Sequence, residues 1–351
     1  MNAVLSNGGR RSRIRAGASL LGLLLLAACG KETAEQPSGN AERVSLDFTA
    51  RIVAEVRPQT KAAPVEGTIF PARPEDYPIG MWICSHEEAP QQKFAPAMSG
   101  YGNLLASLSV GAKDQGENEY VWNYTFDERT HSVLSVRREV PIDIYAYHPY
   151  TEEAGDPTRI PFTSGEEDWM WAEPQPLTAD DLTGPSVRVP LRFKHAMTCL
   201  QVGIRCLYTG SVRLTSMTLT DSRGRLYARG TMNALTGELT CAEEDKTESI
   251  TISPNTALNT TETVFCIIMP PVEDYKNEEF TLSFVFNGID GKTDYKLPAT
   301  MKDLTTQNDV TITEFETGKR YIYHLTLDNT MSFAPVGVDD TWQSENIDLE
   351  L

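Results

Sequence analysis

Cys29 is the residue whose neighbours most clearly predict a chemical modification. The small and apolar residues Leu26–Ala28 lead into it, and Gly30 comes directly after it. This pattern resembles a bacterial lipobox, in which the cysteine thiol receives a diacylglycerol and the chain is then cut in front of the cysteine. The alternative is an ordinary cleavage site that happens to contain a cysteine. We expect lipidation at Cys29.

Residues 1–28 have the layout of an export signal. Four arginines between residues 10 and 15 precede the run Leu20–Ala28, which is nearly all Leu, Gly and Ala. This run is too short to cross a bilayer as a helix. Cleavage before Cys29 changes the net charge from −18 to −22, because 27 basic and 49 acidic residues remain. Acyl chains rather than charge must therefore hold the mature chain at a membrane, with residues 29–42 as a polar tether.

Adjacent carboxylates are the other groups with a potential for chemistry. A glycosidase needs two carboxylates held apart across a cleft, whereas these acids stand in runs inside turn-like segments. We interpret them as solvated loop acids, and the oxygen spacing of a calcium loop is absent from the sequence. The runs are Glu87/Glu88, Glu166/Glu167/Asp168, Asp180/Asp181, Glu243/Glu244/Asp245 and Asp339/Asp340.

The remaining polar motifs do not favour an enzyme. His195 stands alone in the sequence, and a structural histidine is the simpler interpretation. The sequence has no nucleophile elbow, phosphate-binding glycine loop or paired metal motif. We therefore expect a protein that is not an enzyme, with no catalytic residues, no metal site and no cofactor. The acidic net charge also argues against a nucleic-acid partner.

Two tryptophans could bind a ligand. Trp169 and Trp171 would lie on one face of an extended segment, as a sugar-stacking platform requires. Aromatic residues at such spacing more often pack in the core or between sheets, which is the interpretation we favour. The alternative is a surface glycan-binding lipoprotein that uses these two residues, with Trp122 as a third.

The cysteines other than Cys29 fit buried free thiols. They stand in apolar or alternating segments, and their number is odd. Cys199 and Cys206 are seven residues apart, so in a regular strand they would face opposite sides and could not pair. The five residues are Cys84, Cys199, Cys206, Cys241 and Cys266.

The body of the chain alternates apolar and polar residues with period two, which predicts strands separated by turns. No segment keeps a helical period over three turns, so we expect an all-β fold of sandwiches. A Pro- and Asp-rich stretch before residue 186 suggests two domains, 43–185 and 186–351. The predicted strands are the alternating run from Val44 to Ala54, then Ile79–Ile83, Tyr120–Phe126, Ile142–Tyr147, Val187–Phe193, Leu200–Leu207, Val212–Leu219, Val264–Met269, Phe280–Phe286 and Tyr321–Leu327.

An ordered series of motifs resembles the fimbrillin family, the type V pilin lipoproteins of Bacteroides and Porphyromonas relatives. Each motif is weak alone, but their order and spacing over nearly the whole mature chain are specific. The series consists of the lipobox, the strand Val44–Val56 followed by Thr60-Lys61-Ala62, then Tyr77–Ile83, Ile144–Tyr150 (with His148 where Tyr is usual), Asp168–Ala172, Val189–Leu200 and Trp342.

The resemblance implies two transthyretin-like β-sandwich domains in tandem, in a stalk or tip subunit of a cell-surface fimbria that contributes to adhesion. In that family a lipidated precursor reaches the outer membrane, and an Arg- or Lys-specific protease removes the first strand. The emptied groove then accepts a strand from another fimbrial subunit, which is β-strand addition between chains. The expected partners are therefore other pilin subunits and the membrane, reached through the lipid anchor.

Parts of this chain could serve that assembly. The run Val44–Val56 could fill its own domain, and cleavage at Arg57 or Lys61 would detach it. Arg51 lies within the expected strand, and cleavage at Arg43 would free only the anchor. A donor strand is expected at the C-terminus, where Ile347, Leu349 and Leu351 alternate with polar residues. The alternative is that both segments are edge strands of a finished monomer.

Overall fold

The computed structural model describes residues 42–52, 78–86, 94–112, 118–289, 292–328, 331–340 and 342. These residues belong to one compact unit that runs from Ala41 to Leu351. They form strands and turns, with one short 3-10 helix at Glu243–Asp245 and no α-helix among the described residues. The all-β prediction is confirmed. The described part of the chain also contains no helix that is long and apolar enough to cross a membrane.

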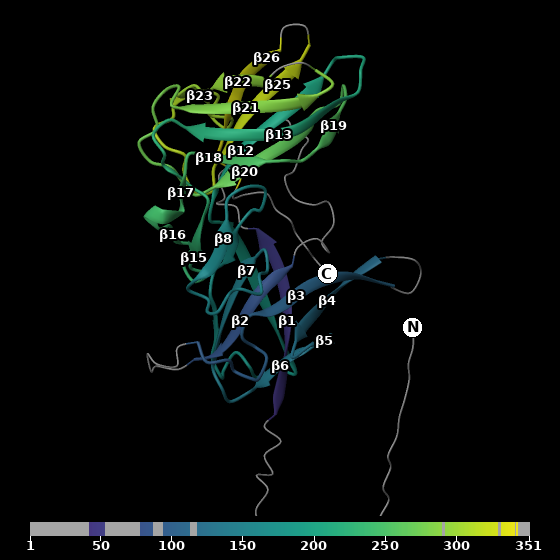
Figure 1. The fold of residues 1–351 in the computed structure, drawn as a ribbon. Helices are drawn as coiled ribbons and strands as arrows, with labels where there is room; N and C mark the ends of the chain where they lie inside the picture. The colour runs from purple at the N-terminus through teal and green to yellow at the C-terminus, as the bar shows by residue number, and fades with distance from the viewer. Residues whose placement is uncertain are drawn as a thin grey trace, which may run out of the picture. The chain divides into compact units, whose positions relative to one another are not determined.

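The first sheet has ten strands in the order β5-β4-β3-β2-β7-β9-β11-β1-β6, with β10 paired to β7 (Figure 1). Its first and last strands, β5 and β6, are separated by only two residues in the chain. The sheet therefore curls back on itself. The strands are β1 Arg43–Ile52, β2 Ile79–Ser85, β3 Leu104–Ala112, β4 Asn118–Phe126, β5 Arg129–His131, β6 Leu134–Arg137, β7 Ile142–His148, β9 Met170–Ala172, β10 Gln175–Leu177 and β11 Ser186–His195.

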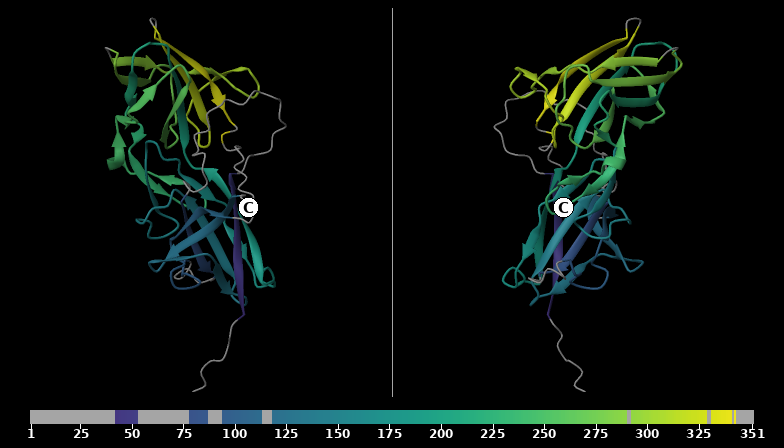
Figure 2. Two further views of the ribbon diagram at one scale, coloured as in Figure 1. Left: turned by 90° about the vertical axis from the view of Figure 1, so that its right-hand side faces the viewer. Right: turned by 60° about the vertical axis from the view of Figure 1, so that its left-hand side comes forward.

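Side chains join the two arms of this curled sheet. The Tyr101 hydroxyl donates to the carbonyl of Ser135 on β6 and accepts from its amide, at 3.0 and 3.1 Å. The enclosed core draws on apolar residues of nearly every strand, because alternate residues of each strand point inward. β1, the purple strand in both views of Figure 2, contributes to this core from within the sheet.

The second half of the chain forms a sandwich of two further sheets. A four-stranded sheet, β20-β12-β25-β26, shares one hydrophobic core with a five-stranded sheet built on β18, β19, β13, β21 and β22. The strands are β12 Thr198–Cys206, β13 Val212–Asp221, β18 Ser249–Ile252, β19 Thr256–Leu258, β20 Thr263–Met269, β21 Phe280–Asn287, β22 Lys292–Lys296, β25 Arg320–Leu327 and β26 Ser332–Asp339, together with the hairpin β23 Thr300–Lys302 and β24 Asp309–Thr311.

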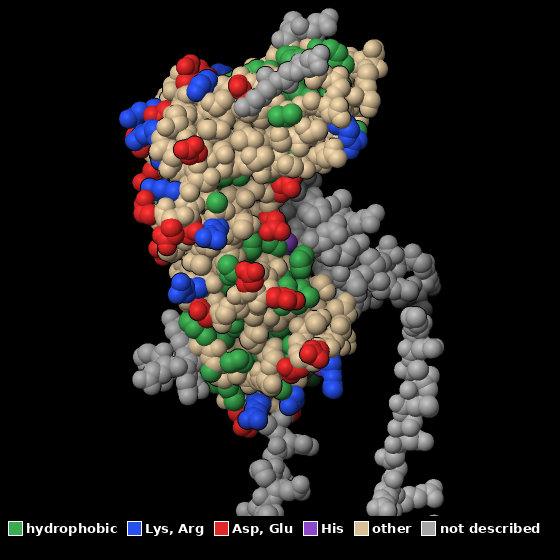
Figure 3. Space-filling view, viewed as in Figure 1, with side chains coloured by type: hydrophobic (Ala, Val, Ile, Leu, Met, Phe, Trp, Pro, Cys, Tyr) green, Lys and Arg blue, Asp and Glu red, His purple; other side chains and the backbone are tan. Residues whose placement is uncertain are grey.

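One small sheet connects the two halves, and another lies within the second half. β8 (Ile160–Thr163) pairs with β15 (Arg229–Met232), which pairs with β16 (Leu239–Thr240). β14 (Leu226–Tyr227) pairs with β17 (Lys246–Thr247). Acidic and basic side chains are interspersed over this edge of the molecule (Figure 3), and they include the Arg229–Asp245 and Lys246–Glu243 ion pairs at 2.6 and 2.9 Å.

Strand pairing bears on the predicted division at residue 185. β11 begins directly after that residue, yet it pairs with β1 and β9 of the first sheet. A division drawn by strand pairing therefore falls after His195, between β11 and β12. The halves also share a third core, which takes Trp82 from β2 and Ile268 from β20.

Candidate functional site: a strand slot in the first sheet

The first strand occupies a slot between two strands that are distant from it in sequence. β1 runs parallel to β11 over eight paired residues and antiparallel to β6 over four. We call the space between β11 and β6 the β1 slot. If β1 were absent, neither β11 nor β6 would have a paired strand on that side. The sheet would then have two unpaired edges there.

Alternate side chains of β1 enter the core. Val44 and Phe48 are 0% exposed and Leu46 is 4% exposed, whereas Arg43 and Asp47 face outward. Burying each such apolar side chain contributes about 1.5–3 kcal/mol. The strand predicted here is therefore found at Arg43–Ile52, and its alternating burial is confirmed from Val44 to Phe48.

The far half of β1 is held by a side chain instead of by β6. β6 pairs only with Arg43–Leu46, so the carbonyl of Phe48 lies beyond its end. The indole Nε1 of Trp122 donates a 2.9 Å hydrogen bond to that carbonyl. The Phe48 ring also meets Tyr124 edge-on, with ring centroids 6.0 Å apart.

Arg138 secures the beginning of the strand. Its guanidinium forms a 3.1 Å ion pair with Glu42 and donates to the carbonyl of Gly184. Its backbone amide donates to the carbonyl of Glu42 at 3.0 Å. The contacts join the start of β1 to the turn after β6 and to the segment before β11.

Two of the four predicted cleavage residues lie within β1. Arg43 is its first residue, and Arg51 is paired in register with Arg192. A protease binds its substrate as an extended free strand, so paired backbone is a poor target. Arg57 and Lys61 lie outside the described residues, as do Cys29, the signal and tether segments, and the predicted donor residues Ile347, Leu349 and Leu351.

The two tryptophans of the glycan alternative are held by the protein itself. Trp169 is 4% exposed, packs near Phe162, and donates to the carbonyl of Thr163 at 3.3 Å. Trp171 is partly buried, with the ammonium of Lys194 5.7 Å from its ring centre. Trp122 is also buried. A sugar cannot stack on Trp169 in this conformation, which argues against the alternative.

Sequence reasoning missed a buried polar cluster at the junction of the two halves. Asp168 is 8% exposed, and its carboxylate lies 2.6 Å from Nδ1 of the buried His195. The His195 ring stacks on Trp342, which is fully buried, with centroids 3.9 Å apart. Neither the isolated histidine nor the acidic run revealed this pair, because the partners come together only through the pairing of β11 with β9.

The interpretation of all adjacent acids as solvated is wrong for two of them. Asp168 pairs with His195, and Asp339 lies buried 2.5 Å from the guanidinium of Arg320. In both cases a partner of opposite charge or a hydrogen-bond donor offsets the cost of burying a carboxylate. These acids are therefore structural groups of the junction and of the second sandwich.

The five described cysteines are free thiols, as predicted. Cys199 and Cys206 face different cores, which confirms that they lie on opposite sides of β12. Burial, with a smaller contribution from Asp143, raises the pKa of Cys84 to about 12. Burial also raises the pKa of Cys199 well above its ordinary value. Such thiols are poor nucleophiles at neutral pH.

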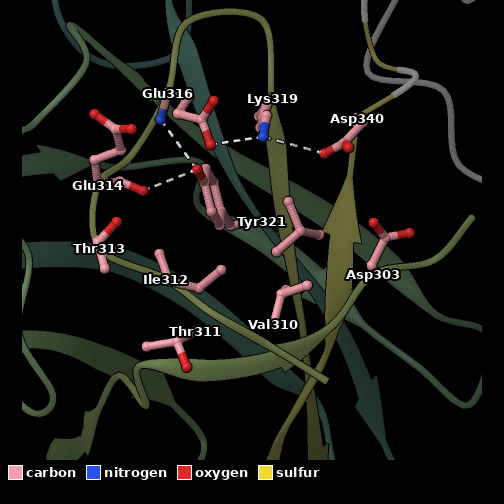
Figure 4. Close-up of a pocket in the computed structure, with 11 residues that line it drawn as sticks. Asp303, Val310, Thr311, Ile312, Thr313, Glu314, Glu316, Lys319, Tyr321 and Asp340 are labelled. Atoms are coloured by element: carbon pink, nitrogen blue, oxygen red, sulfur yellow. Dashed lines mark hydrogen bonds and ion pairs between the residues drawn. The ribbon is translucent and has the colours of Figure 1, made fainter. Parts of the chain in front are cut away.

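A hollow in the second sandwich is lined by charged groups that satisfy one another (Figure 4). Lys319 lies between Glu316 and Asp340, at 2.6 and 3.5 Å. The Tyr321 hydroxyl donates to the carbonyl of Glu314 and accepts from the amide of Glu316, both at 3.0 Å. The hollow therefore offers no unused lysine charge to a ligand, and the β1 slot is the stronger candidate.

Solved structures of Bacteroides proteins are similar to this chain, and one with a TM-score above 0.5 agrees with this fold. The chain spans most of a protein from Bacteroides fragilis NCTC 9343 described as a cell adhesion protein, with 11% identity, a TM-score of 0.51, and 84% and 96% of the two chains covered. A cell adhesion protein from Bacteroides uniformis ATCC 8492 matches with 18% identity, a TM-score of 0.49 and 86% and 99% coverage. A fimbrial protein from Bacteroides vulgatus ATCC 8482 matches with 12% identity, a TM-score of 0.38 and the same coverage.

No curated protein matches the chain. The model of the fimbrillin-like family, however, matches residues 111–340, which include strands of both halves and the residues that wall the β1 slot. That range is well over half of the chain. The chain therefore belongs to the fimbrillin-like family.

Proposed function

We propose that the protein is a structural subunit, in the stalk or at the tip, of a cell-surface fimbria. It is exported as an outer-membrane lipoprotein, assembles by protease-triggered strand exchange, and contributes to adhesion. The observation that carries this proposal is the position of β1, which lies between β11 and β6 and places three apolar side chains in the core. The description of the Bacteroides fragilis neighbour as a cell adhesion protein agrees with it.

The position of β1 in the chain makes it removable. β1 is the first strand of the part of the chain that the structure describes, and residues 53–78 lie between it and β2. One cut in that segment leaves β1 attached to the sheet only by hydrogen bonds and packing. Removing the strand would expose two strand edges and an apolar groove, both of which favour a replacement strand.

Loss of β1 without a replacement is unfavourable. Val44, Leu46 and Phe48 would each give up burial worth about 1.5–3 kcal/mol, and the ladders on both sides would break. We therefore expect exchange, in which the arriving strand restores these contacts. The C-terminal residues Ile347, Leu349 and Leu351 supply the same number of apolar side chains at the same alternate spacing.

The two predicted cleavage residues differ in the residue on their C-terminal side. Arg57 precedes Pro58, whose ring and tertiary amide make the bond a poor substrate for trypsin-like proteases, whereas Lys61 precedes Ala62. We assign the productive cut to the bond after Lys61. That cut leaves the lipid anchor and β1 on one fragment and the remaining sheet on the other.

Limited proteolysis tests this function. The mature chain, residues 29–351 with Cys29→Ser, is treated with a trypsin-like protease and followed by intact mass and size-exclusion chromatography. We expect one early cut after Lys61, followed by growth of high-mass oligomers. Lys61→Gln should delay both, whereas Arg205→Gln, at an exposed position of β12 outside the slot, should behave like the parent. A clean cut that leaves a stable monomer would overturn the proposal.

A further inference from the structure

The outward face of the β1 slot is basic, although the chain as a whole is strongly acidic. β11 presents the exposed residues Arg188 and Arg192 on this face, and β6 presents the exposed Arg137. Their register partners on β1 are Asp47, Arg51 and Arg43. The strand in the slot therefore lies between β11 and β6, which together carry three exposed arginines.

Most neighbouring charges already have partners, but these three arginines do not. Lys194 forms a 2.8 Å ion pair with Glu173, and Arg138 pairs with Glu42. Among the described residues, no carboxylate pairs with Arg137, Arg188 or Arg192. Their charge is thus available to whichever strand fills the slot.

The first strand matches this face poorly. Arg43 stands opposite Arg137, which places like charges in register, and the position of β1 in register with Arg192 is residue 51, which is not an acid. Only Asp47 stands opposite an arginine of opposite charge, Arg188. Like charges directly opposite one another in a sheet are destabilising, whereas opposite charges are favourable. β1 therefore fills the apolar side of the slot well and the charged side badly.

The C-terminal segment has the complementary pattern. When Ile347, Leu349 and Leu351 point into the core, the alternating positions that face outward are Asn346, Asp348 and Glu350. If the strand faced the other way, the carboxylates of Asp348 and Glu350 would be buried in the core, which is strongly unfavourable. A strand with acids at two outward positions would thus replace one whose single acid in register with these arginines is Asp47.

We propose that Arg137, Arg188 and Arg192 form a selectivity ladder that favours an acidic donor strand over β1, and that its occupant is the C-terminal segment 346–351 of a second copy of this chain. This inference rests on the proposed strand exchange, and it adds that complementary charge selects the incoming strand. It also gives the exchange a direction, since the incoming strand brings two carboxylates to a face where β1 offers only Asp47. The local attraction acts over a few ångströms, while the mutual repulsion of two acidic subunits is screened at physiological salt.

A peptide-capture experiment tests the ladder. The mature chain is cleaved while fluorescein-labelled peptides of residues 343–351 are present, and capture is measured by anisotropy. We expect the native peptide to bind about fivefold more tightly than its Asp348→Asn, Glu350→Gln form. This preference should shrink as salt is raised. The double variant Arg188→Gln, Arg192→Gln, which leaves only Arg137 of the ladder, should reduce this preference strongly, whereas Arg205→Gln on β12 should leave it intact.

Charge reversal keeps the test independent of folding defects. The variant Arg188→Glu, Arg192→Glu should prefer a peptide with Asp348→Lys and Glu350→Lys over the native peptide. Equal capture of acidic and neutral peptides by the parent protein would overturn the ladder and leave strand exchange standing. Capture of no peptide at all, after a verified cut, would overturn strand exchange itself and the ladder with it.

Discussion

The indole of Trp122 donates its hydrogen bond to the backbone of Phe48 at the point where β6 no longer pairs with β1. A side chain of β4 therefore completes the hydrogen bonding of a strand on the opposite arm of the curled sheet. Because the acceptor is a backbone carbonyl, any strand that fills the β1 slot could receive the same bond. Trp122 thus belongs to the slot rather than to β1.

Replacing Trp122 with Phe tests this bond. Phenylalanine has a smaller ring than tryptophan and no N–H, so the buried Phe48 carbonyl loses its hydrogen-bond donor. We expect the free energy of unfolding to fall by about 2–3 kcal/mol in urea denaturation, from the lost bond and the smaller ring. Tyr124→Phe is the matched control, since the Tyr124 ring contacts Phe48 and the substitution keeps that ring. An equal loss in the control would contradict the role of the indole.

Truncating Phe48 to Ala should weaken β1 without changing its charge. The substitution leaves a cavity among fully buried residues, and such changes typically cost about 3–5 kcal/mol. Because the lost contacts are between β1 and its slot, the cleaved variant should also exchange its strand faster than the cleaved parent. Rates of oligomer growth after proteolysis would show this. Asp47→Ala, on the exposed face, should change the free energy of unfolding by no more than about 0.5 kcal/mol.

The strands that sequence reasoning located are those with long, regular alternation. β1, β12, β13, β21 and β25 all lie within or close to the predicted runs. β26 was missed because Pro335 and Gly337 interrupt its pattern. β3 was missed although its apolar residues alternate with Ser107, Ser109 and Gly111, because these residues have a low preference for strands. Short strands such as β8 are defined by their partner β15 rather than by their own residues.

The sequence alone predicts the apolar face of β1 but not the strands that form its slot. The apolar face of β1 can be derived from Val44, Leu46 and Phe48 alone, since alternation decides which side is buried. Its neighbours cannot be derived from any local pattern, because β1 pairs with residues about 140 positions later in the chain. The partner of His195 could not be derived for the same reason, since Asp168 reaches it only through the pairing of β11 with β9.

Removing the carboxylate of Asp168 should loosen the junction. Asp168→Ala deletes the 2.6 Å contact with His195 Nδ1 in a buried site, and we expect a loss of about 1–3 kcal/mol. Because His195 stacks on Trp342, the fluorescence of that tryptophan should report the loosening. Glu167→Ala, which alters the exposed neighbour, should leave stability and fluorescence unchanged. A parallel change in both variants would contradict a specific role for the pair.

Asp221 supplies a pH-dependent contribution to the stability of the second sandwich. Its carboxylate accepts bonds from the backbone and guanidinium of Arg225 at 2.7–2.9 Å, and from the amide of Arg223. Burial alone raises the pKa of Asp221, but these hydrogen bonds lower it more, and the net pKa lies below its ordinary value. The guanidinium of Arg225 also forms a 2.9 Å ion pair with Glu279. The charged group in direct contact with the Asp221 carboxylate is therefore the cationic Arg225.

The lowered pKa of Asp221 determines the sign of the pH effect. A carboxylate with a lower pKa in the folded chain stabilises the protein fully above its unfolded pKa of about 3.9, and this stabilisation is lost as the pH falls through the folded value. Asp221→Asn should therefore cost about 3 kcal/mol at pH 7, with a penalty that shrinks below about pH 4. Urea denaturation at several pH values would measure it. Asp274→Asn, at an exposed ion pair with Arg223, should show little loss at any pH. A penalty for Asp221→Asn that stayed constant down to pH 2 would mean that the loss comes from packing rather than from the charge.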